Sequence, residues 1–96
     1  MIKIKVHTIL GLKEAIGERE VEVSVPEGST LQGLLIQMVK SWGKKLSSRL
    51  FEPGTGSLLP HIRLMVNGRD VAFLNNMETV LQEGDEVLIF PPVSGG

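Results

Sequence analysis

Apolar and polar residues alternate in two stretches near the start of the chain, and this period of two predicts two half-buried strands. The apolar positions are Ile2, Ile4 and Val6 in the first strand and Val21, Val23 and Val25 in the second. The polar positions between them are Lys3, Lys5 and His7 in the first strand and Glu20, Glu22 and Ser24 in the second. Because one exposed face carries lysines and the other carries glutamates, we expect the two strands to pair antiparallel. Between them, the spacing of Leu12, Ala15 and Ile16 predicts one short helical turn within residues 11–17.

The pattern then changes to a period near 3.6, which predicts the main helix. The segment Ser29-Thr30-Leu31-Gln32 matches a capping box, in which Ser29 accepts a hydrogen bond from the first turn and Gln32 reaches back. We therefore expect a helix from Thr30 to Trp42 that Gly43 ends. Ile36 lies off its apolar stripe, which consists of Leu31, Leu34, Leu35, Met38, Val39 and Trp42.

The regular pattern stops between Lys44 and Leu59. Within this stretch, Leu46, Leu50 and Phe51 predict a short second helix, and Glu52-Pro53-Gly54-Thr55-Gly56-Ser57 has the composition of a turn. Its Gly-Thr-Gly is similar to part of a dinucleotide-binding loop. The third glycine, the preceding strand and the following helix of such a loop are missing, so we do not assign nucleotide binding here.

Three more strands are predicted in the last third of the chain. The first covers His61 to Val66, and the Asn67-Gly68 pair is typical of a type I′ turn that leads into the second, Arg69-Asp70-Val71. Residues 72–81 are irregular, with Val80 and Leu81 expected to pack inward. Residues 82–85 form a turn that starts the last strand, residues 86–90.

The last strand is apolar on both faces, as expected of a central strand, because Val87 and Ile89 alternate with Leu88 and Phe90. A single helix covers only one face of a sheet. We therefore expect Leu88 and Phe90, together with Met65, to form an apolar patch on the open face, where it could serve as a docking surface. The alternative is that the short second helix folds over these side chains and covers them.

The sequence closes with Phe90-Pro91-Pro92-Val93-Ser94-Gly95-Gly96. The two prolines stop the strand, so we expect a domain of residues 1–92 and an extended arm of residues 93–96. Gly95 and Gly96 have no side chains, which would let the arm enter a narrow channel with the Gly96 carboxylate as its only charge. The alternative is that the terminal pair is simply frayed.

Composition and charge exclude several function classes. The 10 Lys and Arg against 11 Asp and Glu give a net charge of −1 without a basic stripe, so nucleic acid is not an expected partner. No apolar run approaches the roughly 20 residues of a membrane span, and no signal-peptide core is present, so we expect a cytoplasmic protein that does not bind membranes. The chain has no cysteine, which excludes disulfides, thiolate nucleophiles and cysteine metal sites.

Conventional catalytic groups are also missing. His7 and His61 lie in different predicted strands with no acid at ligand spacing, and Ser94 has no His or Asp partner. We therefore expect no bound metal or cofactor, and no catalysis by this chain alone.

The order of strands around one capped helix, with Glu83-Gly84-Asp85-Glu86-Val87 leading to the Pro-Pro-Val-Ser-Gly-Gly end, resembles the MoaD family, the small sulfur-carrier subunit of molybdopterin synthase. The resemblance covers nearly the whole chain, although the stretch from Lys44 to Leu59 is longer than in compact bacterial members. It implies an α+β fold of the β-grasp, ubiquitin-like type, with a mixed sheet of four to five strands packed on one main helix.

The resemblance also implies a function in molybdenum cofactor biosynthesis. An E1-like adenylyltransferase (MoeB-like) would use ATP to adenylate the Gly96 carboxylate, and sulfur would replace AMP to give a thiocarboxylate. The arm would then enter the large subunit of molybdopterin synthase (MoaE-like) and donate sulfur to precursor Z, the cyclic pyranopterin monophosphate. Gly95 would provide clearance, and partner binding would fall to Met65, Leu88, Phe90, Pro91, Pro92, Val93 and Ser94.

Two alternatives remain at this point. The activated Gly96 could instead be joined to a lysine of a target protein, as in ubiquitin-like modifiers. The chain could also be a binding module whose tail has no role.

Overall fold

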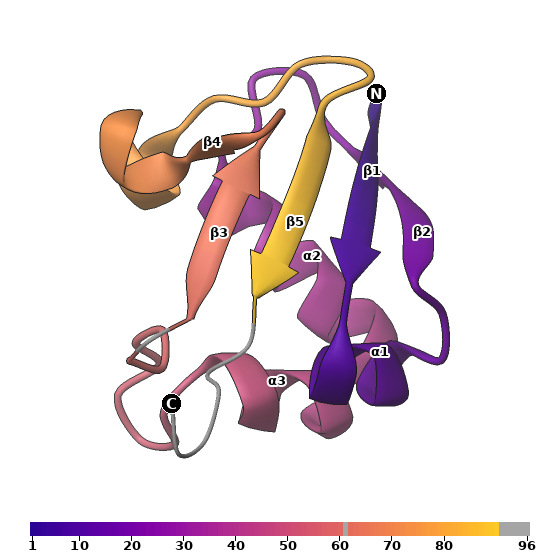
Figure 1. The fold of residues 1–96 in the computed structure, drawn as a ribbon, viewed down its shortest axis with the longest axis vertical. Coiled ribbons are helices and arrows are strands. Elements are labelled where there is room, and N and C mark those ends of the chain that lie inside the picture. Colours follow the sequence, from indigo (N-terminus) through magenta and orange to yellow (C-terminus); the bar gives the residue numbers. More distant parts are fainter. Residues whose placement is uncertain (61, 91–96) are drawn as a thin grey trace.

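The computed structural model describes residues 1–60 and 62–90, apart from the side chain of Leu10 and the burial of residues 10 and 11. A five-stranded sheet of order β2-β1-β5-β3-β4 forms one layer, and helices form the other (Figure 1). The strands are β1 (Ile2–Thr8), β2 (Glu20–Val25), β3 (Arg63–Val66), β4 (Arg69–Asp70) and β5 (Glu86–Phe90). The helices are α1 (Leu10–Ile16), α2 (Leu31–Trp42) and α3 (Lys44–Leu50), with 3-10 turns η1 (Val71–Phe73) and η2 (Asn76–Glu78). The predicted α+β class and mixed sheet are confirmed.

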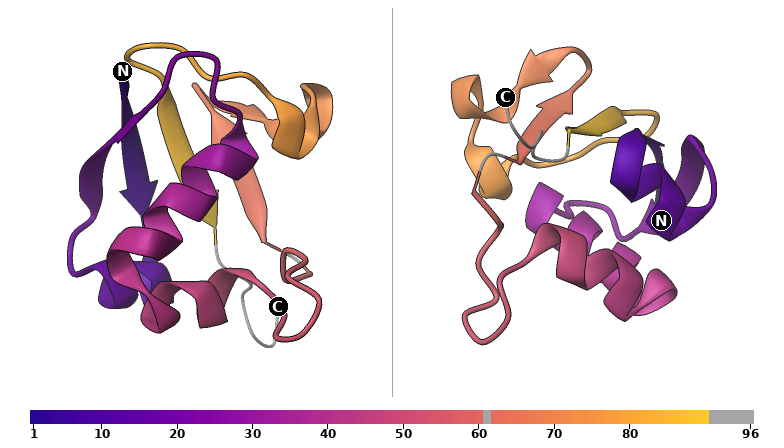
Figure 2. Two further views of the ribbon diagram at one scale, coloured as in Figure 1. Left: turned by 180° about the vertical axis from the view of Figure 1, so that it is seen from behind. Right: turned by 60° about the horizontal axis from the view of Figure 1, so that its bottom comes forward.

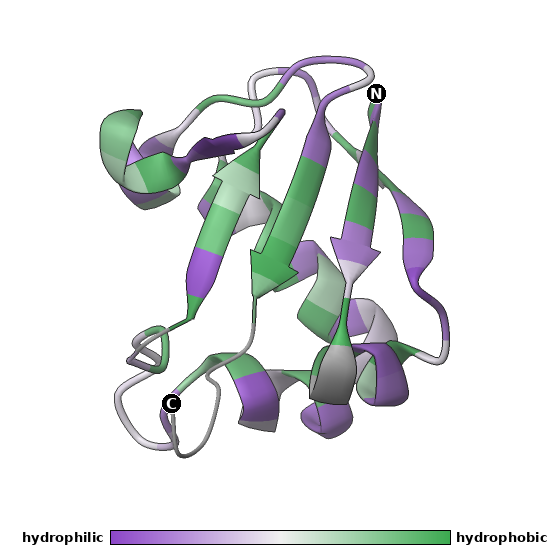
Figure 3. Cartoon of the chain, in the orientation of Figure 1, coloured by the Kyte–Doolittle hydropathy of each residue, from purple (hydrophilic) through white to green (hydrophobic). Residues whose placement is uncertain are grey.

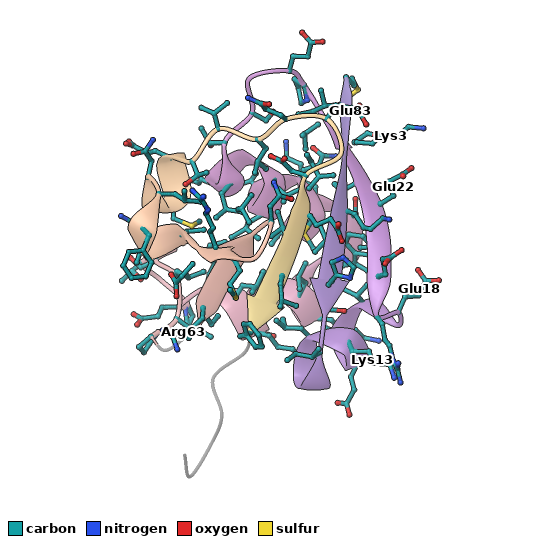
Figure 4. The ribbon with its side chains drawn as sticks, turned by 45° about the horizontal axis from the view of Figure 1, so that its top comes forward. Lys3, Lys13, Glu18, Glu22, Arg63 and Glu83 are labelled. Carbon is teal, nitrogen blue, oxygen red and sulfur yellow. The ribbon has the colours of Figure 1, made fainter. Side chains whose placement is uncertain are left out.

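The first and last described strands, β1 and β5, run parallel side by side in the middle of the sheet, while the other neighbouring strands pair antiparallel. In the β1–β2 pair, Lys5 lies opposite Glu22, and the Lys3 Nζ is 3.9 Å from a carboxylate oxygen of Glu22 (Figure 4). The antiparallel pairing predicted from these charges is confirmed. So is the central position of β5.

Helix α2 packs its apolar stripe on one face of the sheet and forms the core with it. Leu31, Leu34, Leu35 and Met38 of the helix are fully buried. Residues of the central strands that are also fully buried are Ile4, Val6, Val87 and Ile89. Ile36 is 47% exposed, as its position off the stripe predicts.

The helix begins one residue later than predicted because Thr30, and not Ser29, is its N-cap. The Thr30 hydroxyl accepts a hydrogen bond from the Gly33 N–H (3.3 Å), whereas the Ser29 hydroxyl donates to the Pro26 carbonyl (2.6 Å). Residues 29–30 are paired with residues 80–81, which keeps the chain extended up to Thr30. The predicted end of the helix at Gly43 is confirmed: Gly43 has a φ of +69°, and its N–H donates to the Val39 carbonyl.

The helical layer contains two short helices besides α2, and both correspond to predicted segments, although α1 is a seven-residue helix and not a single turn. The predicted short helix is α3, whose Leu46 and Leu50 are fully buried in the common core together with Leu12 of α1. Helix α3 packs against α1 and α2 on the same side of the sheet (Figure 2). The alternative in which this helix covers the open face is therefore wrong.

The β3–β4 hairpin is shorter than predicted. Strand β3 begins at Arg63, and His61 lies outside the described residues. Asn67 and Gly68 have φ values of +51° and +82°, as a type I′ turn requires at both central positions. Strand β4 ends at Asp70 because the Asp70 carboxylate accepts from the Ala72 N–H and starts the turn η1.

The inward orientation expected for Val80 is wrong, since this side chain is 56% exposed. Thr79 and Leu81 are buried on either side of it. Successive side chains of an extended segment point in opposite directions, so the burial of Leu81, which was predicted, places Val80 in solvent.

Candidate docking face

The face of the sheet opposite the helices carries an apolar patch formed by Met65, Leu88 and Phe90, which we call the open-face patch. Met65 and Leu88 are direct partners across the β3–β5 pair. Their strand neighbours Val87 and Ile89 are buried in the core, so alternation directs Leu88 and Phe90 to the other face. All three patch residues are only half-buried, and they are not among the side chains packed against the core. Figure 3 shows the apolar character of β3 and β5 at this position.

Charged residues flank the patch on both sides. One row of paired residues crosses all five strands and consists of Glu20, His7, Leu88, Met65 and Asp70. At one end of the row, the Asp70 carboxylate lies 3.4 Å from an Arg63 guanidinium nitrogen. The face therefore combines an apolar centre with a polar border, which is the composition of a protein docking surface.

His7 lies between two carboxylates, so the expectation of no acid near this histidine is wrong. Its Nε2 is 2.8 Å from a carboxylate oxygen of Glu86, and its Nδ1 is 3.5 Å from a carboxylate oxygen of Glu20. The two acids contact opposite ring nitrogens, so the three groups do not converge on one point. Within residues 1–60 and 62–90, no group of three or more His, Cys, Asp or Glu side chains is arranged to hold a metal ion.

A hydrogen-bond network fixes the start of β5 and hence the position of the patch. The Asn67 side-chain amide donates to the Asp85 carboxylate (2.9 Å), and the Asn67 side-chain carbonyl accepts from the Glu86 N–H (2.9 Å). The second Asp85 oxygen accepts from the Gln82 N–H (2.8 Å). The type I′ turn and the turn before β5 are thereby held together, which sets the register of Leu88 against Met65. The sequence pattern predicts both turns but not the hydrogen bonds of Asn67 with Asp85 and Glu86 that join them.

The structure brings together the predicted partner-binding residues Met65, Leu88 and Phe90 on one surface. The remaining predicted site residues, Pro91, Pro92, Val93, Ser94, Gly95 and Gly96, lie outside the described residues. Because β5 ends at Phe90, the patch directly precedes this segment in the chain. None of the helices in the described part of the chain combines the length and apolar character needed to cross a membrane.

The mixed sheet clasping α2, with the open face on its other side, defines a β-grasp protein of the ubiquitin-like class. The sequence pattern of the ThiS family matches residues 11–96, and this chain belongs to that family of ThiS- and MoaD-like proteins. The family resemblance and the β-grasp fold expected from the sequence are confirmed.

Curated relatives of the chain include both a modifier and a sulfur carrier. Small archaeal modifier protein 3 of Haloferax volcanii is 30% identical over 95 residues, which cover 99% of this chain and 100% of the relative. Sulfur carrier protein CysO of Mycobacterium tuberculosis is 35% identical over 81 residues, which cover 83% of each chain.

Solved structures similar to this chain also include both a modifier protein and a sulfur carrier. The crystal structure of small archaeal modifier protein 1 from H. volcanii superposes with a TM-score of 0.85 at 32% identity, covering 98% of this chain and 99% of the other. A putative molybdopterin converting factor, subunit 1, from Pyrococcus furiosus gives 0.75 at 28% identity, covering 97% and 100%. The BexX/CysO complex of Amycolatopsis orientalis gives 0.76 at 27% identity, covering 97% and 99%. The chain is thus a member of a family of sulfur carriers and ubiquitin-like modifiers.

Proposed function

We propose that this protein carries sulfur as a thiocarboxylate at Gly96 and donates it to precursor Z in molybdopterin synthase. The observation that carries the proposal is the family match running through the Gly-Gly end at residue 96, next to an apolar patch on the strand that leads to it. The similarity to a putative molybdopterin converting factor subunit supports the choice of acceptor. This protein would then be the sulfur-donating small subunit, and the large subunit would bind the pterin.

The chemistry requires only the terminal carboxylate from this chain. A carboxylate is a poor electrophile, because its oxygen is a poor leaving group. An E1-like enzyme that binds ATP would join AMP to the Gly96 carboxylate and release pyrophosphate. A sulfur donor would then displace AMP and leave the thiocarboxylate, whose sulfur is a good nucleophile at neutral pH. No cofactor bound to this chain enters the scheme.

The open-face patch would bring the terminal carboxylate to the partner's active site. Residues 91–96 span at most about 20 Å when fully extended. The body must therefore dock next to the active site of each partner, and the patch lies where the chain leaves β5. Because one patch would serve both the activating enzyme and the synthase, we expect the two partners to bind in turn.

Intact mass spectrometry tests the carrier chemistry. The protein is incubated with ATP, a sulfide source and the E1-like enzyme of its host, and the expected result is the mass gain of one oxygen-to-sulfur exchange, placed at Gly96 by fragmentation. A variant lacking Gly95 and Gly96 is the control and should not change. An unchanged mass of the full chain, with an enzyme that is active on another carrier, would contradict the proposal.

The acceptor is tested separately with the thiocarboxylated protein. Mixed with the molybdopterin synthase large subunit and precursor Z, it should yield molybdopterin and return to its original mass. A thiocarboxylate that forms but gives no molybdopterin would remove the acceptor assignment and leave the carrier chemistry intact.

The second candidate function is a protein modifier, which the full-length similarity to small archaeal modifier protein 3 favours. The activated Gly96 acyl group would then form an isopeptide bond with the amine of a target lysine. The last Lys or Arg before the Gly-Gly end is Arg69, so trypsin would leave residues 70–96 on the target. A Ser94→Arg variant shortens this remnant to Gly-Gly. Lysines carrying that remnant in cells that express the variant would support the modifier function. Their absence would contradict it if the E1-like enzyme still adenylates the purified variant.

A further inference from the structure

The stretch after α2 builds a groove on the helical side of the molecule. Two hollows, of about 320 and 350 Å³, share Phe51 as a lining residue. Ile36, Val39 and Lys40 of α2 line the first, and Lys44, with Pro53 of the following loop, lines the second. We call these two hollows together the helical groove.

The loop that forms one wall of the helical groove is held in place by backbone pairing. The Leu59 N–H donates to the Leu50 carbonyl (2.7 Å), and the Glu52 N–H donates to the Ser57 carbonyl (2.7 Å). Phe51 and Leu58 form a bridge between these bonds and pack against the core. The groove is therefore preformed, which lowers the entropic cost of binding a partner.

The helical groove combines apolar walls with positive charge. Ile36 is 47% exposed on the wall of the first hollow. Residues 28–51 contain no acidic residue, and Glu52 is the one acid that lines either hollow. The cations of this segment are Lys40, Lys44, Lys45 and Arg49. In the part of the chain that the structure describes, none of the four forms an ion pair.

We propose that the helical groove binds an acidic, amphipathic segment of a partner protein. Its apolar side chains would fill the hollows beside Phe51, and its carboxylates would pair with Lys40 and Lys44. An amphipathic helix suits the two hollows because it presents anchors on one face at spacings of three and four residues. Charge complementarity selects an acidic partner, since a basic or neutral one would leave the four cations uncompensated.

Residues of α2 and α3 line the groove, and both helices lie on the side of the sheet opposite the open face (Figure 2). A partner in the groove would therefore leave the open-face patch free. The protein could be tethered through its helices while the Gly-Gly end serves another partner. This inference goes beyond the proposed function and does not depend on the chemistry at Gly96.

A titration of the isotope-labelled full chain, followed by NMR, tests the proposal. The probe is a synthetic helical peptide of about 14 residues with Leu on one face and Glu elsewhere. We expect shifts concentrated at Ile36, Val39 and Phe51, and affinity that falls as salt is added. A peptide with Gln in place of every Glu should bind at least about tenfold more weakly.

Matched charge variants separate the groove from general attraction of an acidic peptide. The double change Lys40→Glu and Lys44→Glu should weaken binding by about tenfold or more. The double change Lys13→Glu and Arg19→Glu, at two exposed positions, alters the net charge equally and should have a much smaller effect. Ile36→Ser, at an exposed position, should also weaken binding while the thermal unfolding midpoint stays nearly unchanged.

Three results would overturn the proposal. The first is an absence of shifts in the groove at millimolar peptide, and the second is equal weakening by the two double variants. The third is a dimer, seen by sedimentation without peptide, that the Lys40→Glu and Lys44→Glu changes dissociate. That result would make a second copy of the chain the occupant.

Discussion

The His7 Nε2 lies 2.8 Å from a carboxylate oxygen of Glu86, and this contact joins the two parallel central strands on the open face. Both side chains are partly exposed, at 32% and 57%. Solvent screens such pairs, so we expect Glu86→Gln to change the free energy of unfolding by less than about 1 kcal/mol. Urea denaturation measures this change. A loss above about 2 kcal/mol would mean that the contact contributes more than an exposed pair does.

The open-face patch is tested by placing a charge in its centre. Leu88→Lys and Phe90→Lys should each weaken binding to the activating enzyme by at least about tenfold, because a lysine would be desolvated without a partner. Isothermal titration calorimetry measures the affinity. Val80→Lys is the matched control, since Val80 is exposed and lies outside the patch. Unchanged binding by both patch variants would remove the patch from the docking surface.

Asn67 has two separable roles, in hydrogen bonding and in backbone conformation. Asn67→Gly removes both side-chain hydrogen bonds of the network and should cost about 1–3 kcal/mol of stability. Asn67→Ala loses the same hydrogen bonds but, unlike the glycine variant, keeps a Cβ at a φ of +51°, so it should be about 1 kcal/mol less stable than the glycine variant. Chemical denaturation of the glycine and alanine variants gives the difference between their free energies of unfolding. An alanine variant as stable as the glycine variant would show that the backbone at this turn relaxes.

The N-cap of α2 is tested by a pair of adjacent substitutions. Thr30→Ala should lower the free energy of unfolding by about 1 kcal/mol, since the Gly33 N–H loses its acceptor. Ser29→Ala should have a smaller effect, because that hydroxyl donates to a carbonyl outside the helix. A larger loss of stability from Ser29→Ala than from Thr30→Ala, measured by thermal unfolding, would show that Ser29 is the N-cap.

Burial along α2 predicts a large loss of stability at one position and a small loss at the next. Leu35 is fully buried, so Leu35→Ala should cost about 2–5 kcal/mol through lost burial and the cavity it leaves. The next residue, Ile36, is largely in solvent, and Ile36→Ala should cost less than about 1 kcal/mol. Similar losses at both positions in urea denaturation would contradict the packing of this helix.

Local periodicity was sufficient to predict most of the fold. The alternation of Ile2, Ile4 and Val6 with polar residues predicts which face of β1 is buried. The apolar stripe of α2, with a period near 3.6, likewise predicts the buried face of the helix. The apolar residues on both faces of β5 pointed to its central position, although only Val87 and Ile89 are buried in the core and Leu88 and Phe90 stay half-buried on the open face.

The errors come from contacts between residues far apart in the sequence. His7 and Glu86 are 79 positions apart, and only the parallel pairing of their strands brings them together. The N-cap shifted to Thr30 because Thr30 pairs with Val80, and the same pairing directs Val80 into solvent. A single sequence contains no local signal for either contact.

The parallel pairing of β1 with β5 also affects how the protein is made. Strand β1 is synthesised long before its central neighbour β5, so the middle of the sheet cannot close until residues 86–90 have been made. Pairing across so many residues slows folding. A chain that stops before residue 86 lacks both the central strand and the open-face patch. Such a fragment would therefore lack the surface that we propose for docking to an activating enzyme.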